Sequence, residues 1–311
     1  MPQSGERKVV LVTRRTRFED LLTRFNTREQ ARFYVEHLGA DFDDYIREHE
    51  NYQQARRLVV GALEAHGRYQ VIDRTYLPNF IFGANDVVLA LGQDGVVANT
   101  LKYLDGQPLA GINPDVNRWD GVLLAWEPAG VAGGLPALLA GRSRLREVSM
   151  GAATFSDGQK LYAVNDFFIG PKSHTSARYE IRIGDRSEAQ SSSGIIVSTG
   201  LGSTGWMRSV ITGSCAVVAD AAHRSVNWNF KARAWNERSL EFVVREPFPS
   251  KSSQATLVCG SVTESQPLVV TSQMAENGVV FSDGIEADFL AFNAGMKVEI
   301  RVADRIGKLV Q

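Results

Sequence analysis

The chain has 311 residues, 44% of them hydrophobic and 22% charged, a composition typical of a globular protein of roughly two domains. Basic and acidic residues nearly cancel, leaving a formal charge of −1, so no overall basic field is available to hold a nucleic acid. The two cysteines, Cys215 and Cys259, lack C-x-x-C spacing, which argues against a structural zinc site or a disulfide framework. We therefore expect a protein of a reducing compartment, the cytoplasm, that binds no nucleic acid.

Membrane insertion is not expected. The longest apolar runs are strand-length, far below the ~20 residues that span a bilayer, and comprise Val9–Val12, Val87–Leu91 and Gly194–Val197. Only Met1–Arg7 precede the first of these runs, which is too short for a signal or transit peptide.

The first third of the chain alternates between strand and helix periodicities, a pattern that predicts helices around a parallel sheet. Strands are expected over Lys8–Thr13, Tyr69–Ile72, Asp86–Leu91 and Leu109–Ile112. A Thr27-x-x-Gln30 capping box opens a helix that ends at Gly39. A second helix is expected from about Asp41 to Gly67 and a short third one over Val96–Leu104.

After about residue 145 the sequence changes to short β-rich runs separated by turn residues, which predicts a second domain built as an antiparallel sheet or sandwich. The turn signals are Ser156-Asp157-Gly158, Ile183-Gly184-Asp185 and Ser282-Asp283-Gly284. The Gly-, Pro- and Ala-rich segment Pro128–Gly141 is the expected crossing point between the domains.

The first candidate site is a turn between a buried strand and a helix, Gly92-Gln93-Asp94-Gly95. In a parallel sheet this turn lies at the carboxyl end of the strand, where helix N–H groups can contact phosphate oxygens. No Gly-Lys-Ser/Thr follows, so the turn is not a Walker A loop. The alternative is that Asp94 only caps the helix.

A second glycine cluster, Gly200-x-Gly202-x-x-Gly205, matches the dinucleotide fingerprint, with Asp220 about 20 residues further on. A Rossmann unit would continue with another helix and strand, whereas His223–Phe248 has aromatic, alternating, β-type sequence. The sequence therefore favours either a hydroxyl-rich loop that cradles a nucleotide or a simple hydrogen-bonded turn.

The third candidate site is the polar pair Asn165-Asp166 inside an apolar run. Such residues would be buried without partners unless a ligand or a polar network satisfies them. The alternative is a strand that begins after a turn at Asn165.

Taken in order, these three clusters resemble the NAD kinase family, in which a Gly-Gly-Asp-Gly-Thr loop, an Asn-Glu pair and a Ser-Thr-x-x-Gly-Ser-x-x-Tyr/Trp loop recur. The mitochondrial-type branch and its bacterial relatives look most similar. The segments that resemble that branch are Val12-Thr-Arg-Arg-Thr-Arg-Phe18, Gly111-Ile-Asn113-Pro-Asp115 and Ser176-Ala-Arg-Tyr-Glu-Ile-Arg-Ile183. Three positions depart from the family pattern: Gln93 replaces a glycine, Val96 replaces a threonine and Asp166 replaces a glutamate.

The resemblance implies an α/β domain with a Rossmann-like parallel sheet over residues 1–125, joined by a C-terminal tail of about 289–311, and an all-β sandwich over 126–288. It implies ATP-dependent phosphorylation of the 2′-hydroxyl of the adenosine ribose of NAD, with Asp94 as the base. The resemblance assigns phosphate or nucleotide binding to Gly92, Gln93, Gly95 and Asn113. It assigns NAD binding to Asn165, Asp166, Thr199, Ser203, Thr204 and Trp206.

The implied partners are NAD and ATP, with Mg²⁺ carried by the ATP phosphates, and a second copy of the chain in a homodimer. No set of His, Cys and carboxylate residues has metal-ligand spacing. Two alternatives remain at this point: a non-catalytic nucleotide-binding relative whose altered loop excludes ATP, and a kinase of the same fold that acts on a sugar or lipid.

Overall fold

The computed structural model describes residues 7–225 and 231–311. The chain forms two compact units, one running to Arg146 and including Lys308–Gln311, the other spanning Glu147–Gly307. The sequence had placed this boundary at 125/126 and the start of the returning tail at 289. The difference arises because the segment 128–141 forms a short 3-10 turn, η2 (Pro128–Gly130), and a helix, α5 (Val131–Leu139), that pack against the first unit.

The first unit is built on a parallel sheet, as predicted. Its strands are β1 (Val9–Thr13), β2 (Tyr69–Asp73), β3 (Val87–Leu91) and β4 (Pro108–Ile112), in the order β2-β1-β3-β4. The end of β16 (Lys297–Val310) pairs in parallel with β4 through Lys308 and Leu309. Every residue of β1 and β3 is buried, because helices cover both faces of the sheet.

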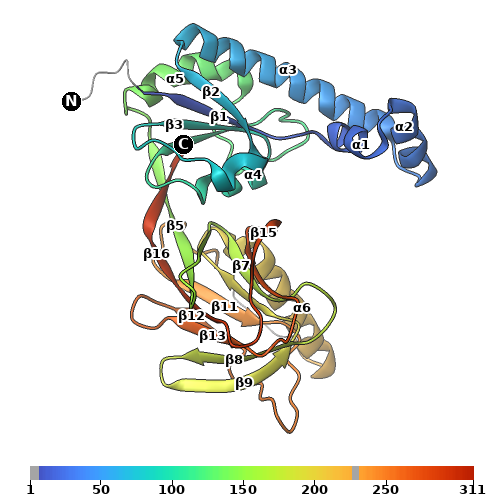
Figure 1. Cartoon of the computed structure of the whole chain (residues 1–311), viewed down its shortest axis with the longest axis vertical. Helices are drawn as coiled ribbons and strands as arrows, with labels where there is room; N and C mark the ends of the chain where they lie inside the picture. The colour runs from blue at the N-terminus through green and yellow to red at the C-terminus, as the bar shows by residue number, and fades with distance from the viewer. Residues whose placement is uncertain (1–6, 226–230) are drawn as a thin grey trace. The chain divides into compact units, whose positions relative to one another are not determined.

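Helices cover both faces of this sheet (Figure 1). The long helix α3 (Phe42–His66) packs with α5 against β1, β3 and β4. It begins at Asp41, whose side chain accepts a hydrogen bond from the N–H of Asp43, and ends at Gly67, which has a φ of 101°. The opposite face carries α4 (Asp94–Leu101), which starts two residues before the predicted Val96.

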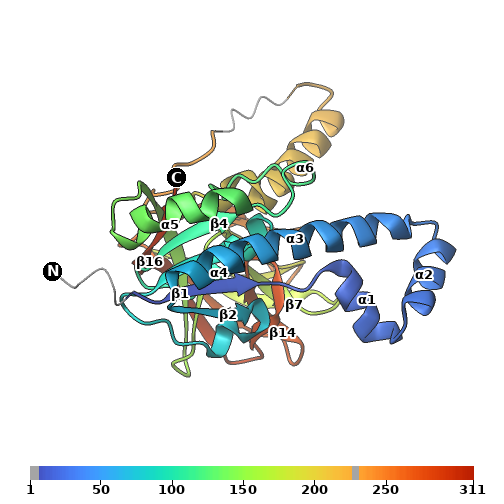
Figure 2. The ribbon, with the colours of Figure 1, turned by 90° about the horizontal axis from the view of Figure 1, so that it is seen from above.

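The N-terminal end of α3 extends beyond the sheet and carries two further helices, α1 (Arg17–Phe25) and α2 (Arg28–His37) (Figure 2). These three helices share a small apolar core that includes Phe18, Ala31 and Phe42. Helix α2 matches the prediction, but α1 was missed, although a capping box formed by Thr16 and Glu19 opens it. A short 3-10 helix, η1 (Arg74–Asn79), follows β2.

The second unit is a β-sandwich, as predicted. One sheet has the order β12-β11-β10-β7-β14-β15, and the facing strands include β16-β13-β8-β9 with β5 and β6. Their apolar side chains form one core between the two layers. The three predicted turns join β5 to β6, β8 to β9 and β14 to β15. The strands are β5 (Leu145–Phe155), β6 (Lys160–Ala163), β7 (Asp166–Pro171), β8 (Ala177–Ile183), β9 (Arg186–Ser192), β10 (Ile195–Ser198), β11 (Leu240–Val244), β12 (Cys259–Val262), β13 (Leu268–Ser272), β14 (Gly278–Ser282) and β15 (Ile285–Ala291).

The glycine cluster at 200–205 is not a Rossmann fingerprint. It connects β10, which is antiparallel to both β7 and β11, to helix α6 (Trp206–Ala221) through a 3-10 turn, η3 (Gly202–Thr204). Among the described residues, α6 therefore does not join β10 to a parallel neighbouring strand, in agreement with the sequence argument. Of the stretch His223–Phe248, residues 226–230 lie outside the described part, and β11 is the strand within the remainder.

Candidate functional site

The predicted phosphate loop joins β3 to α4 in the first unit. Gln93, not Asp94, occupies the N-cap position, and its side chain makes no capping bond. Asp94 is instead the first helical residue, and its carboxylate accepts hydrogen bonds from the N–H groups of Val122 (3.2 Å) and Leu123 (2.8 Å). Asp94 is therefore not a helix cap; it anchors a loop almost thirty residues away in sequence, the segment between β4 and η2.

Gly92 and Gly95 lie in different surroundings. A Cβ atom on Gly92 would come within 2.7 Å of a methyl group of Val96, whereas a Cβ on Gly95 would meet nothing within 4 Å. Val96 is fully buried, so the valine that replaces the family's threonine fills space beneath the loop. The N–H groups of Asp94 and Gly95 open α4, and across the described residues they donate to no backbone carbonyl outside the helix. The exposed side of the loop thus keeps the donors that an anion needs.

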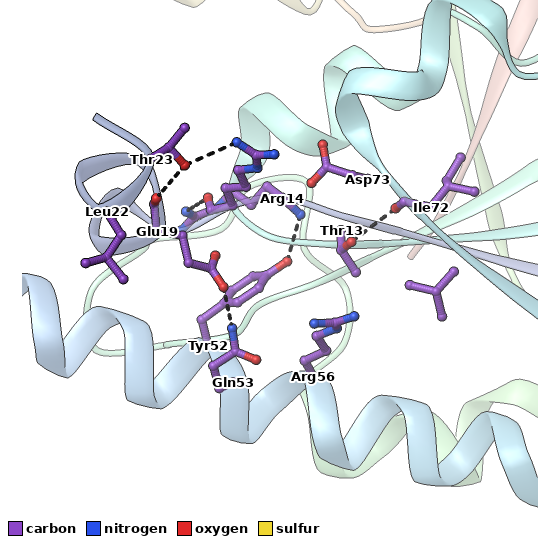
Figure 3. A pocket seen from close by; sticks show the side chains of 12 residues that line it. Thr13, Arg14, Glu19, Leu22, Thr23, Tyr52, Gln53, Arg56, Ile72 and Asp73 are labelled. Carbon is purple, nitrogen blue, oxygen red and sulfur yellow. Dashed lines mark hydrogen bonds between the residues drawn. The ribbon is translucent and has the colours of Figure 1, made fainter. Parts of the chain in front are cut away.

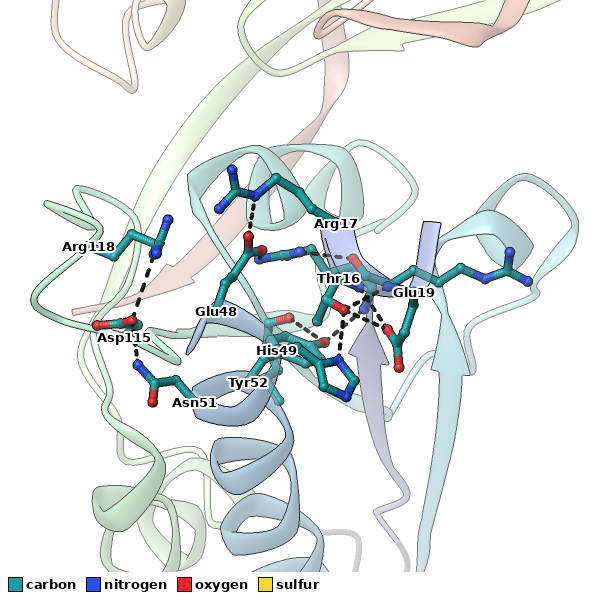
Figure 4. Close-up of polar contacts among 12 residues, drawn as sticks. Thr16, Arg17, Glu19, Glu48, His49, Asn51, Tyr52, Asp115 and Arg118 are labelled. Carbon is teal, nitrogen blue, oxygen red and sulfur yellow. Dashed lines mark hydrogen bonds and ion pairs between the residues drawn. The ribbon is translucent and has the colours of Figure 1, made fainter. Parts of the chain in front are cut away.

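The segment between β4 and η2 is held to α3 by polar side chains (Figure 4). The amide of Asn51 donates to Asp115 at 2.8 Å. Arg118 pairs with Asp44, and this ion pair together with Arg17 keeps the pKa of Asp44 well below its usual range. These contacts fix the same segment that Asp94 holds from the other side.

Asn113 belongs to that segment and was predicted to bind phosphate. Its side-chain amide donates to the carbonyl of Trp119 at 3.0 Å and its side-chain oxygen accepts from the N–H of Asp115 at 3.0 Å. Asn113 is buried. The structure therefore gives this side chain a role in shaping the loop, and phosphate binding by Asn113 stays a prediction.

In the second unit, the other two predicted clusters lie against each other. The N–H of Thr199 donates to the carbonyl of Asn165 at 2.9 Å, and the Thr199 hydroxyl donates to the carbonyl of Val164 at 2.6 Å. A Cβ on Gly202 would lie 2.0 Å from the carbonyl oxygen of Asn165. The glycine is therefore required because the loop passes directly over the backbone of Asn165.

A residue that the sequence marked only as a turn signal completes this arrangement. The carboxylate of Asp283, in the turn between β14 and β15, accepts hydrogen bonds from the N–H groups of Val164 (3.1 Å) and Asn165 (2.6 Å). The N–H of Asp283 donates to the carbonyl of Asp166 at 3.0 Å. The backbone of Asn165 is thus fixed from two directions, while its half-buried side chain makes no hydrogen bond to another described residue.

Asp166 is an unusual carboxylic acid. It begins β7, is only 8% exposed, and burial together with the nearby charge of Asp283 raises its pKa to about 7. Near neutral pH the group is therefore divided between its acid and carboxylate forms, so it can either donate or accept a hydrogen bond.

The hydroxyl-rich loop contains buried hydroxyl groups that bond to backbone carbonyls and an exposed one that does not. Ser203 is buried, donates to the carbonyl of Gly200 at 2.7 Å and accepts from the N–H of Arg233 at 3.2 Å. Like Thr199, it shapes the loop. Thr204 is exposed, and its hydroxyl has no partner among the described residues. For all three residues, contact with NAD stays a prediction.

Trp206 begins α6 and lies on the outer face of the six-stranded sheet rather than in the sandwich core. Its ring stacks on Phe168 with centroids 5.7 Å apart and planes 9° apart. Both rings line a cleft of about 400 Å³ that also includes Phe281, Phe289 and Lys172. The guanidinium of Arg245, which also lines this cleft, lies over the same indole at 5.5 Å from its ring centroid.

A further cleft, not anticipated from the sequence, lies at the carboxyl ends of β1 and β2 (Figure 3). It has a volume of about 520 Å³ and is lined by residues that include Arg14, Arg15, Arg56 and Asp73. In the sequence, Arg14 and Arg15 belong only to a segment that resembles the family, because a pair of arginines does not by itself indicate where its side chains lie.

Across the described residues, no group of three or more His, Cys, Asp and Glu side chains is placed to hold a metal ion. The same part of the chain contains no helix that is both long and apolar enough to cross a membrane.

No protein-family model matches the chain, and no curated protein is significantly similar to it in sequence. Solved structures do share its fold. A NAD kinase from Archaeoglobus fulgidus in complex with ATP aligns with a TM-score of 0.56 at 15% identity, over 97% of this chain and 93% of that one. A yeast NADH kinase complexed with NADH aligns with a TM-score of 0.58 at 11% identity, over 98% and 83%. The predicted NAD kinase-like fold is therefore confirmed.

Proposed function

We propose that this chain is a NAD kinase that transfers a phosphoryl group from ATP to the 2′-hydroxyl of the adenosine ribose of NAD. The observation that carries the proposal is the packing of the Thr199–Gly205 loop on Val164 and Asn165, directly before Asp166. Two motifs separated by more than thirty residues meet in one polar site, in the order that the resemblance requires, within a fold shared with NAD(H) kinases. Because fold alone does not determine activity, the proposal rests on these residues.

Asp94 is the proposed general base. Two backbone N–H donors orient its carboxylate and leave a lone pair on each oxygen for the proton of the ribose hydroxyl. Phosphoryl transfer depends mainly on positioning and electrostatic stabilisation, so one oriented carboxylate beside the acceptor hydroxyl is chemically sufficient. The open N–H groups of Asp94 and Gly95 would accept phosphate oxygens.

Asn165 and Asp166 are the proposed ribose ligands. Asn165 offers an amide whose donors and acceptor are unused by the described residues. Asp166 offers a carboxyl group that can bind a hydroxyl as donor or acceptor. Thr199 and Ser203 would support this site from beneath, with Thr204 and Trp206 facing the ligand.

Mg²⁺ fits this outline as an ion carried by ATP. An ion bound mainly through phosphate oxygens and water needs few protein ligands. When bound, it would neutralise charge on the phosphates.

A coupled assay for NADP formation tests the proposal, with ATP and polyphosphate as donors and NAD and NADH as acceptors. Phosphorylation of NAD or NADH supports it. Nucleotide binding without turnover for any pair would identify a non-catalytic relative, the alternative that the buried Val96 favours. Turnover only with a sugar or lipid acceptor would identify a kinase of the same fold with a different acceptor, and it would also contradict the proposal.

We further propose a homodimer of the mitochondrial-type branch that works in the cytoplasm. These three predictions follow from the family resemblance and from the absence of C-x-x-C spacing between the two cysteines. Sedimentation of the purified chain tests the dimer, and fractionation of the source cells tests the compartment.

A further inference from the structure

The loop that follows β4 has no regular structure of its own. Residues 113–125, between β4 and η2, contain neither helix nor strand. Backbone hydrogen bonds close only its base, where the N–H of Asn113 donates to the carbonyl of Trp126 at 2.8 Å. An irregular loop of this length keeps one conformation only if other contacts offset the entropy of ordering it. The shape of the 113–125 loop therefore depends on side chains that hold it to rigid elements.

An ion pair between Arg118 and Asp44 holds this loop to the first turn of α3. The Nη1 atom of Arg118 donates to Oδ2 of Asp44 at 3.1 Å, and its Nη2 atom donates to Oδ1, so the guanidinium binds both carboxylate oxygens. Arg118 is the main reason why the pKa of Asp44 lies well below its usual range. A two-pronged pair of this kind fixes orientation as well as distance.

The carboxylate that binds Arg118 is itself held in place. Arg17, the first residue of α1, donates to Asp44 at 2.8 Å and also to Glu48 (Figure 4). Glu48 is only 4% exposed and accepts a 2.9 Å hydrogen bond from Arg14, which directly follows β1. The ion pair therefore joins the loop to a charged network that spans α1, α3 and the end of β1.

The other end of the same loop orients Asp94. Five residues after Arg118, the N–H of Leu123 donates to the Asp94 carboxylate at 2.8 Å. The stretch between them is stiffened from within, because the side-chain amide of Asn113 donates to the carbonyl of Trp119 at 3.0 Å. A shift of Arg118 would therefore be transmitted to the backbone groups that hold Asp94.

We propose that Arg118 is a positioning residue for phosphoryl transfer: its ion pair with Asp44 sets the conformation of the 113–125 loop and, through it, the orientation of the Asp94 carboxylate. The inference rests on the proposed function, because it requires Asp94 to act on the acceptor hydroxyl. A misplacement of about 1 Å in a reacting group can lower the rate by up to about a hundredfold. The ion pair should therefore affect kcat rather than nucleotide affinity.

Steady-state kinetics of the full chain with ATP and NAD test this role. Arg118→Ala should lower kcat about tenfold, as expected for a base that is held less precisely, and should leave the KM for ATP and for NAD unchanged. Arg118→Lys keeps the charge but loses the two-pronged geometry, so it should recover part of the lost kcat. A higher KM with an unchanged kcat would overturn the proposal, because the loop would then belong to a binding surface.

Asp44→Asn breaks the same ion pair from α3, outside the loop, and keeps the test decisive if Arg118→Ala does not fold. It should lower kcat to a similar extent. The double variant should lose no more than either single variant, because both substitutions remove one interaction. Losses of kcat that multiply in the double variant would overturn the proposed pairing.

Arg32→Ala is the matched control. Arg32 is an exposed arginine on α2 that pairs with Asp43, the residue before Asp44, and it has no hydrogen bond or ion pair with the described residues of the 113–125 loop. Its kcat should equal that of the wild type. An equal loss in this variant would show a general sensitivity to ion pairs near α3 and would overturn the specific role of Arg118.

Hydrogen exchange measured on the same proteins separates this inference from the proposed function, because it requires no activity. Peptides that contain Leu123 should exchange severalfold faster in Arg118→Ala than in the wild type or in Arg32→Ala. If exchange is faster but the wild type forms neither NADP nor NADPH, the ordering of the loop by Arg118 stands and the kinase proposal fails. If NADP forms and Arg118→Ala keeps the wild-type kcat, the positioning role fails and the kinase proposal stands.

Discussion

The carboxylate of Asp94 accepts a 2.8 Å hydrogen bond from the N–H of Leu123. This contact joins the start of α4 to the segment that follows β4, and the neighbouring N–H of Val122 reinforces it. The residue proposed as the catalytic base therefore also organises its own surroundings. Substitutions at Asp94 have to be interpreted with both roles in mind.

Asp94→Asn is expected to preserve folding and nucleotide binding and to lower kcat by about a hundredfold or more, the usual contribution of a positioned base. Asparagine keeps one side-chain acceptor for the N–H of Leu123, so the loop stays anchored. Steady-state kinetics and circular dichroism measure the two effects. Asp120→Asn, at an exposed position, is the control. Full activity in Asp94→Asn would refute the base assignment, whereas unfolding would show that the anchoring role dominates.

Gln93→Gly tests the altered phosphate loop. Since the Gln93 side chain makes no capping bond and glycine is tolerated at the N-cap, stability should hardly change. We expect NAD or ATP binding to weaken by about 1–3 kcal/mol, because the amide of Gln93 acts as an extra donor to phosphate. Calorimetry measures this change. Tighter binding, or activity that appears only in the variant, would mean that Gln93 blocks the loop.

Gly202→Ala tests the contact between the two motifs of the second unit. The added methyl group would lie 2.0 Å from the carbonyl oxygen of Asn165, so the free energy of unfolding should fall by about 1–3 kcal/mol. Binding of NAD should weaken with it. Gly213→Ala is the control, because its Cβ would meet nothing within 4 Å and alanine favours a helix. Urea denaturation of both variants compares them, and equal stabilities would contradict the close approach.

The raised pKa of Asp166 predicts how stability depends on pH. Between the ordinary value of 3.8 and about 7, the folded state binds a proton that the unfolded state releases. The contribution of Asp166 to the free energy of unfolding should therefore be greatest below this range and fall as the pH rises through it, by up to about 4 kcal/mol.

Asp166→Asn should remove this part of the pH dependence and make the protein more stable than the wild type at pH values above about 7. Urea denaturation at several pH values measures it. Asp185→Asn, in an exposed turn, should keep the wild-type profile. An unchanged profile in Asp166→Asn would show that another group carries the effect.

Much of the fold follows from local sequence signals. Continuous apolar runs set β1 and β3, and the Asp41 cap and Gly67 set the ends of α3. These signals suffice because each depends on residues adjacent in the chain. Helices α1, α5 and α6 were not predicted. The first has a short apolar pattern and the second contains glycine and proline, residues typical of loops. The third lies in the domain that was expected to be all-β.

The sequence by itself singled out Asp94, because it lies in a turn between a buried strand and a helix, and the Asn165-Asp166 pair, because polar residues inside an apolar run need hydrogen-bond partners. It could not name those partners. Leu123 lies more than twenty-eight residues from Asp94 in the sequence, and Asp283 lies more than a hundred residues from Asn165. Such pairings depend on the tertiary arrangement of strands and loops rather than on neighbouring residues. The same reason explains the arginine cleft: Arg14, Arg56 and Asp73 come from three separate elements, and only the parallel alignment of β1 and β2 against α3 brings them together.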